Sequence, residues 1–180
     1  GETTFTDIAI ASNRSHNSLS VFEIDKFGVL AHLGEIDTTL TDIYGMCLFV
    51  ENGVAQVFAN DTSGLFERYE VSFNKNKKAK GTLTQSFSLP SQPEGCVVDT
   101  HTNTAYFGEE GAGIWSMDIS STKHEPTFVS AIAPPVEADM EGLALFTVDA
   151  QTYLIASSQG NNSYAIYNIN SKNAEKLTLM

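Results

Sequence analysis

Acidic and amide side chains recur through the second half of the chain at positions where they could bind a metal ion. The residues are Glu94, Glu109, Glu110, Asp139, Glu141 and Gln159. Several carboxylates gathered at one place repel one another, and a hard cation with oxygen ligands relieves that repulsion. Calcium fits best, because it accepts six to eight oxygen ligands in irregular geometry. A solvated acidic rim is the competing interpretation, and the residue types alone favour neither.

A repeated unit of about fifty residues predicts where these side chains lie. Four stretches end alike, in an apolar, polar and apolar pattern, at Ile24, Val71, Ile119 and Ile169, which are 47, 48 and 50 positions apart. A unit of three or four short strands repeating at this length is typical of a propeller blade. The sequence therefore predicts an all-β fold of the β-propeller class.

Equivalent positions of successive blades lie on one face of a propeller, so the acidic and amide groups are expected to converge on one rim. Three units open with a glycine, at Gly45, Gly95 and Gly142. Asp139 and Glu141 are two residues apart, which would place both side chains on one side of an extended strand.

Alternation of apolar and polar residues predicts strands along the whole chain, and no segment has helical periodicity over more than two turns. The predicted strands are 7–12, 19–24, 29–33, 45–50, 55–59, 66–73, 83–89, 95–99, 105–108, 114–118, 128–132, 143–146, 153–157 and 165–169. Cys47 and Cys96 lie in apolar runs and are interpreted as small core residues; a disulfide between them stays open, because spacing alone does not decide it.

The bulk properties restrict the partners. The chain has 180 residues, enough for one domain, and a net charge of −12. A negative surface argues against binding nucleic acid or an anionic membrane, and it requires a cation between the protein and any polyphosphate. No run is long enough to span a membrane. No charged n-region and apolar h-region open the chain, so any signal peptide is expected to have been removed or never to have been there.

Other chemistries find little support. The four histidines have no metal-ligand spacing and are interpreted as surface residues; they are His16, His32, His101 and His124. No nucleophile elbow or phosphate-binding glycine loop is present. The lysines Lys75, Lys77, Lys78 and Lys80 are interpreted as a solvated hairpin loop.

The pattern of units also gives an expectation about completeness. The chain begins at what would be the second strand of one unit and ends after the third strand of the fourth unit. Residues 1–180 are therefore expected to form a partial propeller domain of three to four blades. The chain is expected to be part of a larger protein, which would hold the missing blades or a tandem domain, to form a degenerate, open domain, or to pair with a second copy.

Several motifs resemble the β-propeller phytases, the calcium-dependent alkaline phytate hydrolases of bacteria. Residues 156–167 read ASSQGNNSYAIY, and this stretch is the longest and most specific match. The others are ASNRS at 11–15, QPEG at 92–95, GEE at 108–110, GIW at 113–115 and DMEGL at 139–143. They occur in the family's order and at its spacing, and they cover nearly the whole chain.

The resemblance implies a six-bladed propeller that hydrolyses phytate, or another inositol phosphate, as its calcium complex. It implies that the six acidic and amide residues named at the start bind calcium, with Glu94, Asp139 and Glu141 also catalytic. It implies that Arg14, Tyr44 and Gln159 bind substrate phosphate, with Arg14 stabilising charge in the transition state. A secreted or periplasmic location is implied in the same way.

Two departures from the family pattern keep alternatives open, and one is that the family's upstream phosphate-binding lysines and downstream aspartate-rich closing region have no counterpart here. Where the family has a Lys-Glu pair, this chain has Thr62 and Ser63, which supply neither the positive charge nor the carboxylate. The first alternative is a non-catalytic propeller domain that binds calcium and inositol phosphate and assists a catalytic partner domain. The second is a propeller scaffold for protein contacts.

Overall fold

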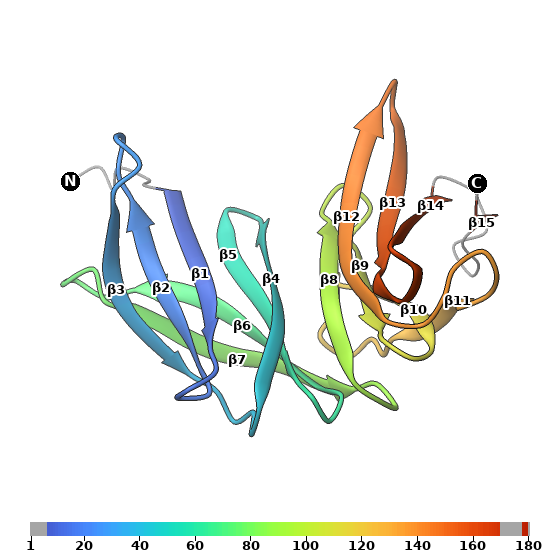
Figure 1. Cartoon of the computed structure of the whole chain (residues 1–180). Helices are drawn as coiled ribbons and strands as arrows, with labels where there is room; N and C mark the ends of the chain where they lie inside the picture. Colours follow the sequence, from blue (N-terminus) through green and yellow to red (C-terminus); the bar gives the residue numbers. More distant parts are fainter. Residues whose placement is uncertain (1–6, 170–177, 180) are drawn as a thin grey trace.

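The computed structural model describes residues 7–169 and 178–179, which form antiparallel strands in four separate sheets (Figure 1). Each sheet is a meander in which strands adjacent in sequence are hydrogen-bonded neighbours. The first sheet contains β1 (Asp7–Asn13), β2 (Ser18–Ile24) and β3 (Leu30–Asp37). The second contains β4 (Ile43–Glu51), β5 (Val54–Asp61), β6 (Leu65–Phe73) and β7 (Ala79–Ser88).

The third and fourth sheets repeat this order. The third contains β8 (Pro93–Asp99), β9 (Thr104–Glu109), β10 (Gly113–Asp118) and β11 (Thr127–Ala131). The fourth contains β12 (Met140–Val148), β13 (Gln151–Ser158), β14 (Ser163–Asn168) and the short β15 (Thr178–Leu179). Among the described residues the single helical segment is a 3₁₀ turn, η1 (Gln159–Asn161). The prediction of an all-β fold is confirmed.

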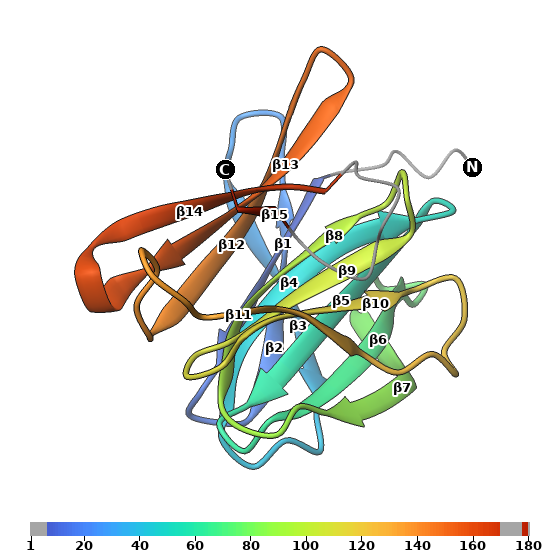
Figure 2. The same cartoon turned by 90° about the vertical axis from the view of Figure 1, so that its right-hand side faces the viewer.

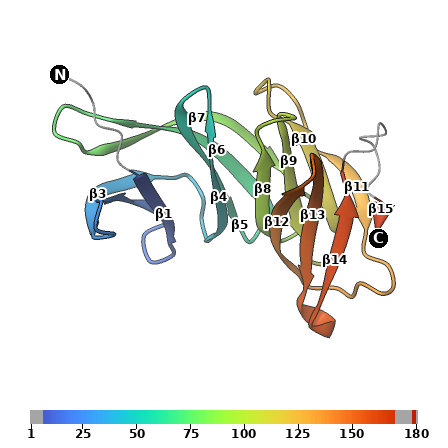
Figure 3. The same cartoon turned by 90° about the horizontal axis from the view of Figure 1, so that it is seen from above.

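The four sheets stand side by side in chain order, as successive propeller blades do, and this is plain from above (Figure 3). β4, β8 and β12 are the first strands of their sheets. β8 contacts both β4 and β12, so these three strands lie next to one another along the inner side of the array of sheets. The tip of the β12–β13 hairpin projects beyond the neighbouring strands (Figure 2). The total number of blades in a closed ring stays a prediction.

Alternating side chains of the middle sheets enter two different cores, because both faces of these sheets are covered. On β5, Val57 and Ala59 belong to the cluster packed against the first sheet. Phe58, between them, belongs to the cluster packed against the third sheet, where it meets Phe107 edge-on at 5.3 Å between ring centroids. This explains why β5 reads as a nearly continuous buried run.

A buried arginine joins the second and third sheets at the end away from the predicted rim. Arg68 on β6 is 3% exposed and donates to Glu51 Oε2 at 2.8 Å and to the backbone oxygen of Ile119 at 3.1 Å. The guanidinium is therefore neutralised and its hydrogen-bonding capacity is largely used within the fold.

The strand predictions differ from the structure in several places, and β12 runs over Met140–Val148 rather than over 143–146. β3 extends to Asp37 rather than ending at Leu33, because an irregularity in the β2–β3 register lets Gly34, at φ 127°, continue the pairing. β7 begins at Ala79 rather than Leu83, so Lys80 lies in a strand and not in the hairpin loop. β15 adds a fourth strand to the last sheet, where alternation gives no signal over two residues.

Candidate functional site

The candidate site lies at the end of the molecule where β4, β8 and β12 begin, which is the lower end in Figure 1. Three side chains occupy the same position, the second residue of each of these strands: Tyr44, Glu94 and Glu141. A register irregularity follows in all three strands. Such bulges re-aim side chains, and here they occur where the strands enter the rim.

Glycines allow these inner strands to approach one another backbone to backbone. A Cβ atom on Gly45 would lie 1.8 Å from the backbone oxygen of Glu94, and one on Gly95 would lie 2.2 Å from that of Glu141. No side chain can occupy those positions without moving a strand. The glycines therefore bring Tyr44, Glu94 and Glu141 to adjacent places on the rim.

Three carboxylates from two sheets gather beside Tyr44. Glu94 Oε2 is buried and has no hydrogen-bond partner. Burial is the largest cause that raises the pKa of Glu94 to about 7. It is followed by the charge of Glu141, by side-chain hydrogen bonding with Glu141 and Glu110, and by the charge of Glu110. The pKa of Tyr44 is also raised, by burial and by the charges of Glu94, Glu110 and Glu141. These shifts show that the four side chains share one negatively charged environment.

Arg14 supplies a positive charge to this environment. It follows β1, and its guanidinium carbon lies 4.9 Å from the centroid of the Tyr44 ring, which is cation–π geometry. Its charge opposes the rise in the Tyr44 pKa. The Arg14 side chain is exposed, so its hydrogen-bond donors remain accessible to an anion.

Backbone hydrogen bonds attach Asp139 and Gln159 to the same rim. The amide of Asp139 donates to the Glu110 backbone oxygen at 2.9 Å, and the amide of Gln159 donates to that of Asp139 at 2.8 Å. The prediction that Asp139 and Glu141 share one side of an extended strand is wrong. β12 begins at Met140, and Asp139 precedes it with a φ of 84°, outside the extended region.

Glu109 is predicted as a metal ligand, and its carboxylate is occupied by donors of the protein. Its side chain is 2% exposed and accepts hydrogen bonds from Ser91 Oγ at 2.5 Å and from Trp115 Nε1 at 2.7 Å. Both carboxylate oxygens therefore accept hydrogen bonds, one from β10 and one from the loop that precedes β8. Glu110 lies at the rim, whereas the carboxylate of Glu109 is hydrogen-bonded within the fold, and its role as a metal ligand stays a prediction.

Gln92 and Asn60 contact the rim and were missed by the sequence analysis. Gln92 Nε2 donates to Glu110 Oε1 at 2.5 Å, and it stands two residues before Glu94 in a motif that was already singled out. Asn60 is fully buried, donates to the backbone oxygen of Pro93 at 3.0 Å and leaves its own Oδ1 without a partner. The position of Asn60 near the end of β5 is the feature of the sequence that could have identified it.

The positions that depart from the family pattern lie in a tight turn. Asp61 Oδ1 accepts hydrogen bonds from the backbone and hydroxyl of Ser63, at 2.9 and 2.6 Å. Thr62 Oγ1 donates to Asp42 Oδ2 at 3.0 Å. Thr62 and Ser63, which stand at the two positions of the family's Lys-Glu pair, carry no charge.

The donor chemistry of the rim fits a hard cation. Its side chains offer carboxylate and amide oxygens, and Glu94 Oε2 is a buried acceptor without a donor. Within residues 7–169 and 178–179, no three His, Cys, Asp or Glu side chains are already arranged around one ion position. Binding a calcium ion therefore requires the carboxylates of Glu94, Glu110 and Glu141 to turn toward a common point.

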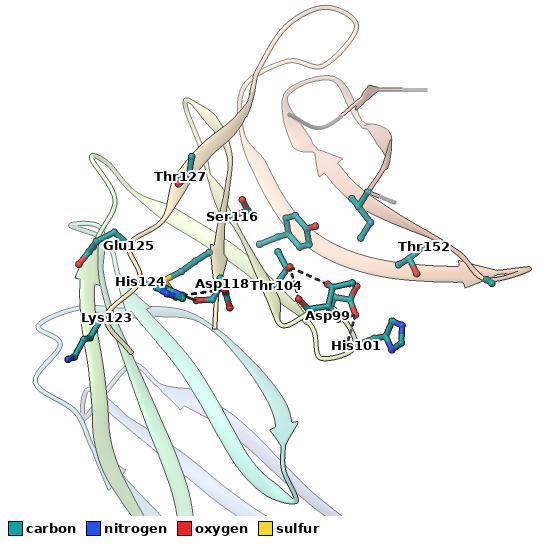
Figure 4. Close-up of a pocket in the computed structure, with 15 residues that line it drawn as sticks. Asp99, His101, Thr104, Ser116, Asp118, Lys123, His124, Glu125, Thr127 and Thr152 are labelled. Carbon is teal, nitrogen blue, oxygen red and sulfur yellow. Dashed lines mark hydrogen bonds and ion pairs between the residues drawn. The ribbon is translucent and has the colours of Figure 1, made fainter. Parts of the chain in front are cut away.

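A cavity of about 990 Å³ lies at the opposite end, between the third and fourth sheets (Figure 4). Its polar groups serve the local turns. Asp99 Oδ1 accepts from the amide of His101 at 3.0 Å, and the His124 ring lies 2.9 Å from the backbone oxygen of Asp118. None of the buried polar atoms without partners in the described part of the chain lines it. The rim, rather than this cavity, is therefore the candidate site for binding a ligand.

Two predictions about surface groups are confirmed. The side chains of the four histidines are exposed. The lysines form an exposed hairpin end between β6 and β7, apart from Lys80, and Lys77 Nζ lies 3.2 Å from Glu23 Oε1. The described residues include no helix with the length and apolarity needed to cross a bilayer.

A propeller-type array of sheets with an acidic rim thus describes the class of protein, and comparisons with known proteins agree. The model of the phytase family matches residues 1–178, so the chain belongs to the phytase family. A 3-phytase of Bacillus subtilis (strain 168) is 34% identical over 179 residues, which cover 93% of this chain and 47% of that protein. The chain therefore spans about half the length of this relative.

Solved structures support the fold alone. A 6-phosphogluconolactonase candidate from Bacteroides uniformis matches with a TM-score of 0.72 at 19% identity, over 98% of this chain and 54% of that one. The major allergen Mala s 1 of Malassezia sympodialis matches with a TM-score of 0.55 at 11% identity, over 96% and 74%. At these identities the likeness concerns the arrangement of the sheets.

Proposed function

We propose that this chain carries the calcium and phosphate site of a phytase, an enzyme that releases phosphate from phytate. The observation that carries the proposal is the group of Glu94, Glu110 and Glu141 beside Arg14 and Tyr44, with Glu94 Oε2 buried and unpaired. Membership of the phytase family and similarity to a 3-phytase support the same activity. Asp139 and Gln159, bonded through their backbones to this rim, belong to the proposed site.

The rim residues have distinct roles in this proposal. Glu94, Glu110 and Glu141 hold calcium, with Asp139 and Gln159 as further oxygen donors. Calcium held by these residues would neutralise a polyphosphate substrate and would lower the pKa of a water for attack on phosphorus. Arg14 donates hydrogen bonds to the phosphate oxygens, where charge develops in the transition state. Tyr44 packs beneath the Arg14 guanidinium and orients it.

Glu94 is also suited to hold a proton. Its pKa of about 7 in the metal-free rim lies near neutral pH, where a carboxyl group exchanges protons most readily. Oε2, which no protein donor contacts, is the atom that would carry the proton. Because calcium binds the ionised carboxylate, calcium and this proton compete for Glu94.

The acidic surface is consistent with a substrate delivered as a calcium complex. At a net charge of −12, the protein repels free phytate. An exported location, secreted or periplasmic, is part of the proposal and is supported by the Cys47–Cys96 disulfide, because disulfides persist in oxidising compartments.

The deciding experiment measures phosphate release from phytate at neutral to mildly alkaline pH, first with excess calcium and then with a chelator. We expect release that is abolished by the chelator and is reduced by roughly a hundredfold in Glu94→Gln and Glu141→Gln. Glu125→Gln, which makes the same charge change at the opposite end of the molecule, serves as the control and is expected to retain activity.

Calcium binding without phosphate release would contradict the catalytic proposal. It would leave a calcium and inositol-phosphate-binding domain that assists a catalytic partner domain. Release that persists in Glu94→Gln and Glu141→Gln would show that the rim is not the site.

A further inference from the structure

The seam between β4 and β8 determines how the site is assembled. These strands begin adjacent sheets, and no hydrogen-bonded ladder joins them. β4 carries Tyr44, which supports Arg14, and β8 carries Glu94. The distance between the cationic and the acidic parts of the rim therefore depends on direct links across this seam.

Three such links converge on β8 around Glu94. Cys47 on β4 and Cys96 on β8 form a disulfide, with their Cα atoms 5.6 Å apart. Asn60 Nδ2 donates to the backbone oxygen of Pro93 at 3.0 Å. Gly45 packs directly against the backbone of Glu94. Arg68 joins the same two sheets at the far end, so these three links are the ones that set the rim.

The covalent link is found at one seam only. β8 and β12 make the same glycine contact, Gly95 against the backbone oxygen of Glu141, without a disulfide. The sequence contains two cysteines, and both are in the bond between β4 and β8. The cross-link is therefore specific to the boundary between Tyr44 and the carboxylates.

Electrostatic repulsion gives a reason for a covalent bond at this place. Glu94 faces the charge of Glu141, which lies in the next sheet, and that of Glu110, which follows β9 of its own sheet. Repulsion between these groups tends to displace the start of β8 until a cation binds. Cys96 follows Glu94 on β8 by two residues. It is 7% exposed and packs into the aromatic core with Phe58 and Phe107, so it anchors β8 to that core.

We propose that the Cys47–Cys96 disulfide is a positioning link that holds Glu94 in register with Tyr44 and Arg14. Loss of the disulfide should then weaken calcium binding by more than the accompanying loss of overall stability explains. This inference rests on the proposed function for its calcium readout, while a second, metal-free readout tests the link independently.

The test compares three variants below their unfolding temperatures. Cys47→Ala/Cys96→Ala removes the bond. Cys47→Val/Cys96→Ala also removes it but refills much of the lost volume. An effect seen in both double variants is therefore not caused by a cavity. Val71→Ala, a core truncation on β6 in a different cluster, is the control for lost stability. The second double variant also keeps the test decisive where the first fails to fold.

Hydrogen–deuterium exchange of the metal-free protein reports on the seam, and calorimetric calcium titration reports on the site. We expect both double variants to exchange the amides of 93–99 roughly tenfold faster and to bind calcium roughly tenfold more weakly, a loss of about 1.4 kcal/mol. Val71→Ala is expected to leave both quantities at the values of the parent protein.

Two results overturn the positioning role. One is exchange in β8 that rises no more than in Val71→Ala. The other is faster exchange with unchanged calcium affinity, which would make the bond a link of the fold alone. If the parent protein binds no calcium, the proposed function fails, and the exchange comparison still decides whether the bond holds β8.

Discussion

Glu109 and Glu110 are adjacent in the chain and have opposite surroundings. Glu109 is buried between Ser91 and Trp115, which donate to its two oxygens. Glu110 is half-buried at the rim, where Gln92 holds one oxygen and the charge of Glu110 raises the pKa of Glu94. The first residue is suited to stability and the second to metal binding.

Substitution by glutamine should separate these roles. Glu109→Gln leaves Ser91 or Trp115 facing an amide nitrogen and should cost about 1–3 kcal/mol of unfolding free energy, with calcium affinity retained. Glu110→Gln should lower calcium affinity roughly tenfold and change stability little in chelator. Thermal unfolding in chelator and calcium titration measure the two effects. An equal loss of calcium affinity in both variants would contradict the assignment.

The raised pKa of Glu94 predicts a pH dependence of stability in the metal-free protein. Between its ordinary value of 4.5 and about 7, the folded protein keeps a proton that the unfolded chain releases. The stabilisation from this group is therefore fully present below pH 4.5 and is lost as the pH rises to about 7.

Glu94→Gln should remove this dependence, because an amide does not titrate. In chelator at mildly alkaline pH, the unfolding temperature of the variant should exceed that of the parent by about 2–4 °C, corresponding to about 1 kcal/mol after solvent screening. Below pH 4.5 the two proteins should unfold together. Parallel curves across the whole range would show that Glu94 ionises normally.

At the scale of the elements, three inner strands repeat one design. Each of β4, β8 and β12 starts with an apolar residue, then a rim residue, then a glycine, and each register is interrupted there. The glycines at the β4–β8 and β8–β12 seams are in backbone contact with the next inner strand. The rim depends on this contact, because it sets the spacing of the carboxylates.

Gly95→Ala should therefore damage both the fold and the site. The added Cβ would meet the Glu141 oxygen at 2.2 Å, so β8 and β12 must separate. We expect a loss of about 1–3 kcal/mol in unfolding free energy and weaker calcium binding. Gly111→Ala is the matched control, since a Cβ there has no neighbour within 4 Å. Thermal unfolding and calcium titration of both variants provide the check.

At the scale of the whole molecule, the fourth sheet has two unlike faces. Leu154 and Ala156 on β13 are fully buried against the third sheet. On the other side of this sheet, Phe146 is 55% exposed and Ile166 is 43% exposed among the described residues. The chain spans about half of its phytase relative, and this apolar face is suited to pack against another sheet.

Substitutions on the two faces should behave differently. Leu154→Ala removes a fully buried side chain and should cost about 2–5 kcal/mol. Phe146→Ser/Ile166→Ser should change the stability of this 180-residue chain by no more than about 1 kcal/mol in total and should reduce its self-association. Chemical denaturation and concentration-dependent light scattering measure these quantities. A large destabilisation by the serine variant would show that the face is covered.

The sequence by itself determined the fold class and the candidate rim. Alternation and a unit of about fifty residues predict successive sheets because strand side chains alternate with period two and equivalent positions of repeats meet at one face. The glycines at 45 and 95 were visible as unit openings, and the structure shows why they are needed. The strand ends were less predictable, because Gly34 and a register irregularity extend β3 through pairing with β2.

Tertiary structure decided which polar residues meet. Glu109 and Glu110 are equally acidic in the sequence, and only the third sheet, with Ser91 and Trp115 beside it, separates their roles. Spacing could not decide the Cys47–Cys96 bond, because its residues are 49 positions apart and meet only when two sheets pack together. Local patterns encode strands and turns, whereas burial, charge proximity and cross-sheet contacts arise only when distant segments are brought together.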